Sequence, residues 1–158
     1  MKWITRERPK TDRIACPWLI RRFIDQDAEI VYLPADQVLS VAEALGAHSF
    51  DAPGAEYTHR ARTDGDGAGG PELCTFEVLV ADFHLEADPA LVELARVVHA
   101  ADVSGELGTH PLGPGLSATG VGGLDVETDD QRLLARAGFV YDALYAYCRR
   151  HPAIAAAP

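Results

Sequence analysis

Residues 8–25 read RPKTDRIACPWLIRRFID, an apolar and basic segment with a proline near its centre. Proline lacks a backbone N–H, and a helix accepts it best in its first turn. We therefore predict a short helix over residues 17–25, with Cys16 as its N-cap. In this interpretation, the loop that leads into the helix carries Asp12 and Arg13.

The rest of the chain alternates helical and extended patterns. Strands are predicted where β-branched and aromatic residues concentrate, at residues 3–6, 29–33 and 48–50. Apolar periodicity and end signals predict helices at residues 36–45, 75–83, 89–102, 116–124 and 128–149. Thr128 and Gln131 have the spacing of a capping box at the start of the last and longest helix. The prediction is an α+β fold, a mostly helical single domain with a small sheet and a long C-terminal helix.

Length and charge limit the possible classes of function. The chain has 158 residues, and we predict that residues 1–150 form one domain and that 151–158 are a disordered tail. It carries 14 basic and 24 acidic residues, for a formal net charge of −10. A protein that binds nucleic acid non-specifically, or an anionic membrane surface, needs a basic face. We therefore expect neither partner.

Cysteine spacing and hydropathy suggest a cellular location. Cys16, Cys74 and Cys148 form no CxxC pair, which argues against a structural thiolate zinc site. No stretch approaches the ~20 apolar residues of a membrane span, and no apolar signal segment follows Met1. We expect a cytoplasmic protein, and a homodimer is compatible with this sequence.

Histidines and carboxylates recur at helical spacing in two places. Glu56 and His59 stand three residues apart, as do His99 and Asp102, and Glu77 lies in a helical first turn between the two pairs. Residues three apart share a helix face, and the second pair adjoins an apolar stripe, so it should point toward the domain interior or its edge. A buried carboxylate is costly unless it is paired or bound to a cation. Two histidines with two carboxylates suit Zn, Fe or Mn.

The same residues have a purely structural alternative. Asp102 would cap a neighbouring element, His99 would make a buried hydrogen bond, and His59 would be solvated. Spacing alone does not separate the two interpretations, because such pairs arise often by chance.

A second candidate site consists of Lys10, Arg13 and Cys16, which precede the helix predicted above. Unpaired N–H groups and the helix dipole favour an anion at such a terminus, and the same field would lower the pKa of Cys16. This terminus could bind an oxyanion or carry a nucleophile. Alternatively, Cys16 is buried beside Trp18 as a small hydrophobe, and Arg13 pairs with Asp12 or Asp25.

Four pieces of the sequence carry a resemblance to a known family. They are residues 8–25, His59-Arg60 with ELCTFE at 72–77, VVHAAD at 97–102, and YDALY at 141–145. Together they resemble the bacterial chromate-resistance protein family, in the domain found at the C-terminal end of ChrB-type proteins. The family positions matched include Lys10, Arg13, Cys16, His59, Cys74, Glu77, His99 and Asp102.

The resemblance favours His59, Glu77, His99 and Asp102 as the ligands of one divalent ion, either Fe, Mn or Zn. An open coordination position would admit water or a small anion such as chromate, as in a metal-dependent hydrolase or oxidoreductase. A second hypothesis is a non-catalytic module that senses or sequesters an oxyanion at Lys10, Arg13 and Cys16. A third is a domain whose buried polar residues are satisfied internally.

Overall fold

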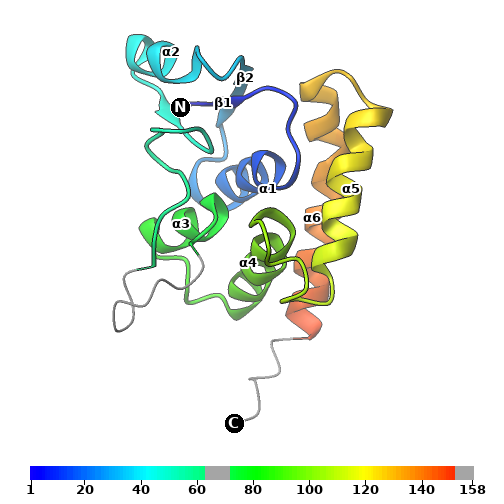
Figure 1. The fold of residues 1–158 in the computed structure, drawn as a ribbon. Helices are drawn as coiled ribbons and strands as arrows, with labels where there is room; N and C mark the ends of the chain where they lie inside the picture. The colour runs from blue at the N-terminus through cyan, green and yellow to red at the C-terminus, as the bar shows by residue number, and fades with distance from the viewer. Residues whose placement is uncertain (63–71, 152–158) are drawn as a thin grey trace.

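The computed structural model describes residues 1–62 and 72–151 (Figure 1). The glycine-rich segment 64–71 and the predicted tail beyond His151 lie outside the described residues. The elements in chain order are β1 (Lys2–Arg6), α1 (Thr11–Leu19), the π-helical η1 (Ile20–Ile24), β2 (Glu29–Leu33), α2 (Val38–Leu45), β3 (His48–Ser49), α3 (Thr75–Asp82), α4 (Pro89–Asp102), α5 (Gly113–Val126) and α6 (Asp130–Arg150). The predicted α+β class, with a small sheet and a long C-terminal helix, is confirmed.

The sheet is parallel, with strand order β2-β1-β3. Trp3 of β1 is in register with Ile30 on one side and His48 on the other. Parallel neighbours require a crossover connection, and α1 with η1 supplies the one from β1 to β2. The segment containing α2 then returns the chain to the opposite edge of the sheet.

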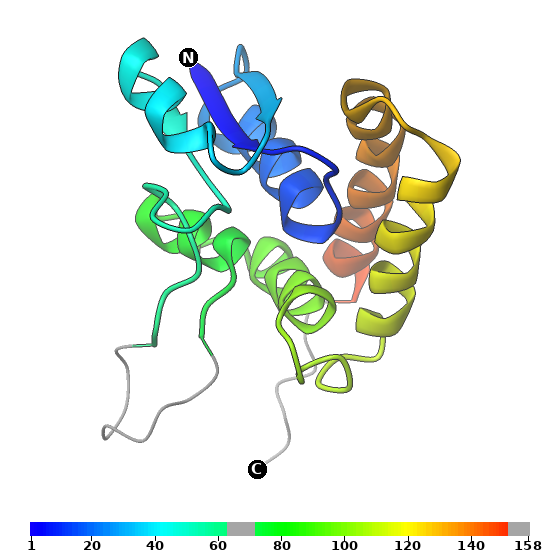
Figure 2. The same cartoon turned by 45° about the horizontal axis from the view of Figure 1, so that its top comes forward.

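Helix α1 lies at the centre of the molecule. In both views α5 and α6 run side by side along one flank, while the sheet and α2 occupy the other (Figures 1 and 2). Helix α1 packs against α3, α4 and α6. The largest fully buried side chains come from β1, α1, η1, α3 and α4 and from Phe50 after β3. They are Trp3, Phe50, Phe76, Ile4, Leu19, Ile20, Leu79, Leu91 and Leu94. Among the described residues, no helix is long and apolar enough to cross a bilayer.

The prediction for the first helix is wrong at its start. Helix α1 begins at Thr11, so Asp12 and Arg13 lie in its first turn and Pro17 lies inside it. Pro17 has no N–H to donate to the Arg13 carbonyl four residues earlier. The hydroxyl of Tyr32 on β2 donates to that carbonyl at 2.7 Å instead. A donor from a distant strand therefore lets the helix pass through the proline.

The other elements lie close to their predicted positions, with two differences. Helix α5 is longer than predicted, and Gly113 at its start lies where a Cβ would be 2.8 Å from the Cβ of Ala100, so a glycine lets α5 approach α4. Helix α6 is capped by Asp129, whose carboxylate accepts the N–H of Arg132 at 2.9 Å, and not by Thr128.

Candidate functional site

A partly buried cluster of charged and polar side chains lies where α1, α3 and α4 meet the segment that follows β3. Asp12 comes from the first turn of α1, and Asp102 is the last residue of α4. Asp51 and His59 belong to the segment after β3, and Thr75 begins α3. Residues from four distant parts of the sequence therefore form one charged cluster between these helices and the segment after β3.

His59 is surrounded by carboxylates. Its Nε2 lies 3.1 Å from Asp102 Oδ2, 3.6 Å from Asp12 Oδ2 and 3.9 Å from Asp51 Oδ1. Its Nδ1 lies 3.0 Å from Glu72 Oε1. The hydrogen bonds to Asp102 and Asp12 raise the pKa of His59 to about 11, and so the imidazole holds a proton unless another cation replaces it.

Asp12 has two different oxygens. Oδ2 accepts the backbone N–H groups of Thr75 at 2.7 Å and Phe76 at 3.3 Å, so the carboxylate caps α3. Oδ1 is buried and has no hydrogen-bond partner among the described residues. Burial, followed by the negative charge of Asp102, raises the pKa of Asp12 to about 7. A fully buried carboxylate thus keeps one oxygen available to a ligand.

Asp102 also has a structural contact. Its Oδ1 accepts the backbone N–H of Asp12 at 3.4 Å, at the start of α1. The structural alternative, in which Asp102 caps a neighbouring element, thus describes one of its oxygens. The other oxygen faces His59.

Two arginines complete the cluster on the side away from His59. Arg6 donates from Nε to the Asp51 carbonyl at 2.7 Å and pairs with Asp51 Oδ2 at 3.2 Å. Arg13 Nε lies 3.7 Å from the same Oδ2. Thr75 Oγ1 donates to Asp51 Oδ1 at 3.2 Å. Asp51 therefore stands between the arginines and the histidine.

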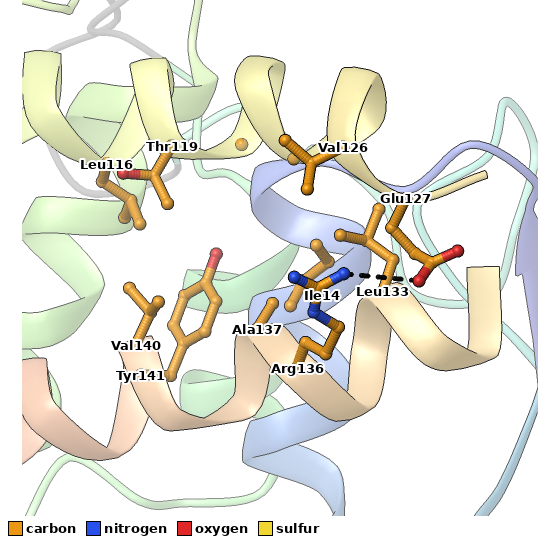
Figure 3. Close-up of a pocket in the computed structure, with 12 residues that line it drawn as sticks. Ile14, Leu116, Thr119, Val126, Glu127, Leu133, Arg136, Ala137, Val140 and Tyr141 are labelled. Carbon is orange, nitrogen blue, oxygen red and sulfur yellow. Dashed lines mark hydrogen bonds and ion pairs between the residues drawn. The ribbon is translucent and has the colours of Figure 1, made fainter. Parts of the chain in front are cut away.

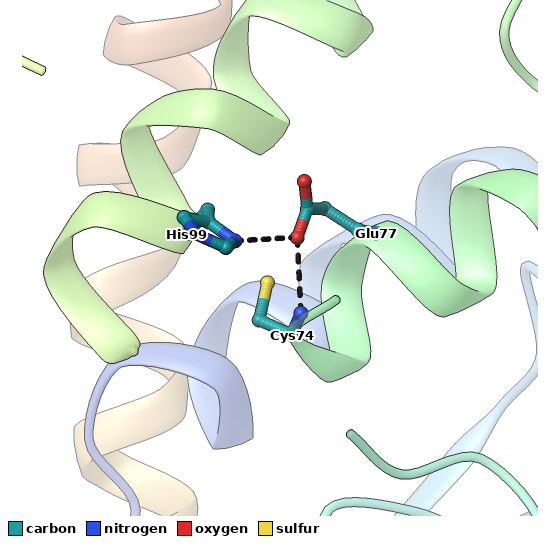
Figure 4. A group of neighbouring side chains, drawn as sticks. All are labelled: Cys74, Glu77 and His99. Atoms are coloured by element: carbon teal, nitrogen blue, oxygen red, sulfur yellow. Dashed lines mark hydrogen bonds and ion pairs between the residues drawn. The ribbon is translucent and has the colours of Figure 1, made fainter. Parts of the chain in front are cut away.

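The four predicted metal ligands fall into two groups. His59 and Asp102 lie together with Asp12, a residue predicted to lie in a loop and not included in the predicted ligand set. Glu77 and His99 lie together with Cys74 (Figure 4). Within each group, one ligand atom from each residue lies within 4.8 Å of the others. The signal for Asp12 was its place in the most specific family segment, beside Arg13.

The predicted anion site around Cys16 is not assembled as expected. Lys10 is the exposed N-cap of α1, whereas Cys16 is fully buried in the middle of the helix. Burial and the charges of Asp12 and Asp51 raise the pKa of the Cys16 thiol, the opposite of the expected direction. The alternative interpretation of Cys16 as a small buried residue is correct. Of the three predicted residues, Arg13 alone joins the charged cluster.

Comparison with known proteins gives the family. The model of the ChrB C-terminal domain matches residues 3–148. Protein ChrB of Cupriavidus metallidurans is 37% identical over 148 residues, which cover 92% of this chain and 40% of that protein. The chain thus spans about two fifths of the length of this curated relative. No solved structure matches significantly. The chain belongs to the ChrB C-terminal domain family of chromate-resistance proteins.

Proposed function

We propose that this domain binds one divalent transition-metal ion through Asp12, His59 and Asp102, and that the bound ion acts on or responds to a small oxyanion. One observation carries the proposal. His59 Nε2 lies 3.1 and 3.6 Å from carboxylate oxygens of Asp102 and Asp12. Two neighbouring ligand atoms bound to one ion at about 2.0–2.2 Å, at tetrahedral or octahedral angles, stand about 2.8–3.6 Å apart.

The charge around His59 also supports a cation. Three carboxylates face its Nε2, and among their oxygens Arg6 and Arg13 contact only Oδ2 of Asp51, which is not the Asp51 oxygen nearest to His59. Asp12 is the least compensated, because it is fully buried and its Oδ1 lacks a partner among the described residues. A divalent ion would replace the proton of His59 and place positive charge beside Asp12.

The surroundings of the three proposed ligands fit a metal centre. Glu72 lies at hydrogen-bond distance from Nδ1 of His59, which is the carboxylate–histidine arrangement that orients a metal-binding imidazole. One nitrogen and two carboxylate oxygens suit Fe, Mn or Zn. When bound, such an ion could polarise an anion or activate water.

Arg6 and Arg13 would position the oxyanion. Both contact Asp51, whose other oxygen lies 3.9 Å from His59 Nε2, so the arginines adjoin the proposed metal site. Arginine suits an oxyanion, because its planar group can donate two parallel hydrogen bonds. Chromate is the first anion to test, given the family.

The experiment is metal analysis of protein purified without chelator, followed by equilibrium dialysis against Mn²⁺, Fe²⁺ and Zn²⁺. We expect His59→Ala and Asp102→Asn to lose this ion. His151→Ala and Asp36→Asn are the matched controls, because both side chains are exposed and lie outside the cluster. Equal metal content in the wild type and in the two cluster variants would refute the proposal.

A second candidate function is oxyanion binding without a metal. It is favoured by Arg13 Nε, which is buried and makes no hydrogen bond to the described residues. An anion that displaced the Asp51 carboxylate would accept hydrogen bonds from Arg13 Nε and from Arg6. Calorimetry of the metal-free protein with chromate, sulfate and phosphate tests this function. Binding that is lost in Arg13→Ala supports it, and unchanged affinity in that variant excludes it.

A further inference from the structure

We infer that Cys74, Glu77 and His99 form a second, separate metal site, which takes a thiophilic divalent ion such as Zn²⁺. The cluster lies outside the Asp12–His59–Asp102 group and has a different ligand chemistry. One atom each of the thiol, carboxylate and imidazole lies within 4.8 Å of the others. Figure 4 shows the cysteine sulfur and the glutamate oxygen directed toward the histidine ring.

Two helices hold these ligands in place. Cys74 is the N-cap of α3, and Glu77 at the third position of the helix accepts the backbone N–H of Cys74 at 3.0 Å. The same Glu77 oxygen lies 2.6 Å from Nδ1 of His99, which projects from the last turn of α4. The capping arrangement fixes the glutamate, and α4 brings the histidine to it. The ligand set therefore depends on the contact between α3 and α4.

The capping box and the ion pair with His99 hold Glu77 and His99 in place, and within the box the Cys74 sulfur accepts the backbone N–H of Glu77. Cys74 is fully buried, and its sulfur lies beside the other two ligand atoms. A cysteine, a histidine and a carboxylate are all ligands of Zn²⁺, with bonds of about 2.0–2.3 Å. To coordinate, the 2.6 Å separation between Glu77 and His99 must widen by roughly 0.7 Å, a small side-chain adjustment.

A pocket gives an ion access to this site. A pocket of about 200 Å³ is lined by both Glu77 and His99, with Arg62, Arg96 and His110 among its other walls. His110 is not available as a ligand, because its Nε2 lies 3.0 Å from Glu93 and its Nδ1 accepts the N–H of Leu112. Three protein ligands then leave the fourth position toward the pocket, as in zinc sites that bind water or a substrate.

Ligand chemistry separates the two ions. The Asp12–His59–Asp102 group offers nitrogen and hard oxygen and no sulfur, whereas the second group offers a thiol. Soft thiolate ligands select Zn over Mn. Metal binding must release the thiol proton to solvent, because burial and the charges of Asp12 and Glu77 raise the pKa of Cys74.

Cobalt titration of the full, chelator-stripped chain tests the inference. Co²⁺ bound to a thiolate gives a near-ultraviolet charge-transfer band that nitrogen and oxygen ligands do not give. We expect this band in the wild type and in Cys148→Ser, which removes an equally buried thiol on α6. We expect no band in Cys74→Ser, and in His99→Gln an affinity lower by about tenfold or more. Zn²⁺ should displace the cobalt.

Two outcomes would overturn the inference, namely no band in the saturated wild type or a band that survives in Cys74→Ser. If Cys74→Ser fails to fold, zinc X-ray absorption of the wild type decides, through the presence or absence of a sulfur neighbour at about 2.3 Å. His59→Ala separates the two sites. The His59→Ala variant should keep the cobalt–thiolate band and bind one ion fewer than the wild type. If the band persists and no metal is lost, the Cys74–Glu77–His99 site is supported and the Asp12–His59–Asp102 site is refuted.

Discussion

The Tyr32 hydroxyl donates a hydrogen bond to the Arg13 carbonyl at 2.7 Å, which joins strand β2 to the first turn of α1. In a regular helix the residue at position 17 would donate its N–H to this carbonyl, but Pro17 has no N–H. Burial raises the pKa of Tyr32, which favours the protonated hydroxyl that donates this hydrogen bond. The contact keeps α1 helical through the proline, and it holds Asp12 and Arg13 in the charged cluster.

Tyr32→Phe should therefore lower the free energy of unfolding by about 1–2 kcal/mol, because it leaves a carbonyl without a donor. In a Pro17→Ala background the loss should be smaller, since the alanine N–H can donate to Arg13. Urea unfolding of the four proteins gives the coupling energy. An equal loss of unfolding free energy in both backgrounds would contradict this role. The control Tyr147→Phe alters an exposed tyrosine and should change the unfolding free energy little.

Asp12 should have a measurable role as the cap of α3, apart from any metal. Asp12→Ala removes the acceptor of the Thr75 and Phe76 N–H groups, and it should cost about 1–3 kcal/mol of unfolding free energy. Asp12→Asn keeps an acceptor oxygen and should retain most of this stability. Thermal and urea unfolding in chelator measure both, with Asp36→Ala as an exposed control. The prediction fails if alanine and asparagine destabilise equally.

Stability in the absence of metal should fall as the pH rises from about 5 to 8.5. The folded pKa of Asp12 is raised from 3.8 to about 7, so folding retains a proton that the unfolded chain has lost, and stability decreases across that interval. The pKa of His59 is raised from 6.5 to about 11, so its contribution is complete below 6.5 and declines above it. The two effects have the same sign.

Urea unfolding in chelator at a series of pH values measures this decline. In Asp12→Asn the profile should be flatter, because one titrating group is removed and His59 loses a charged partner. A wild-type profile as flat as that of the variant would show that the cluster does not bind protons in this way.

Native Cys16 should be unreactive toward thiol reagents. Burial and nearby carboxylates raise its pKa, so little thiolate forms at neutral pH, and the side chain is not accessible. Cys74 and Cys148 are also buried, so no labelling is expected in the folded chain and three labels are expected in urea. Rapid native modification mapped to Cys16 by peptide mass would restore it as a candidate nucleophile.

The regular elements could be predicted from the sequence because their signals are local. The β-branched and aromatic run of β2, and the Asp88-Pro89 start and apolar stripe of α4, fixed both elements to within a residue. The family was also evident, since its motifs are contiguous stretches such as residues 8–25. The sequence further marked His59, Glu77, His99 and Asp102 as one group of candidate ligands.

The division of those residues into two clusters was decided by tertiary structure. His99 and Asp102 share the end of α4, yet one faces Glu77 on α3 and the other faces His59 and α1. Which neighbour each meets depends on how the helices pack, which three-residue spacing does not encode. The start of α1 could not be predicted from the sequence for a similar reason. Local rules include the hydrogen bond that is lost at Pro17, but they do not include the one that Tyr32 donates from a distant strand.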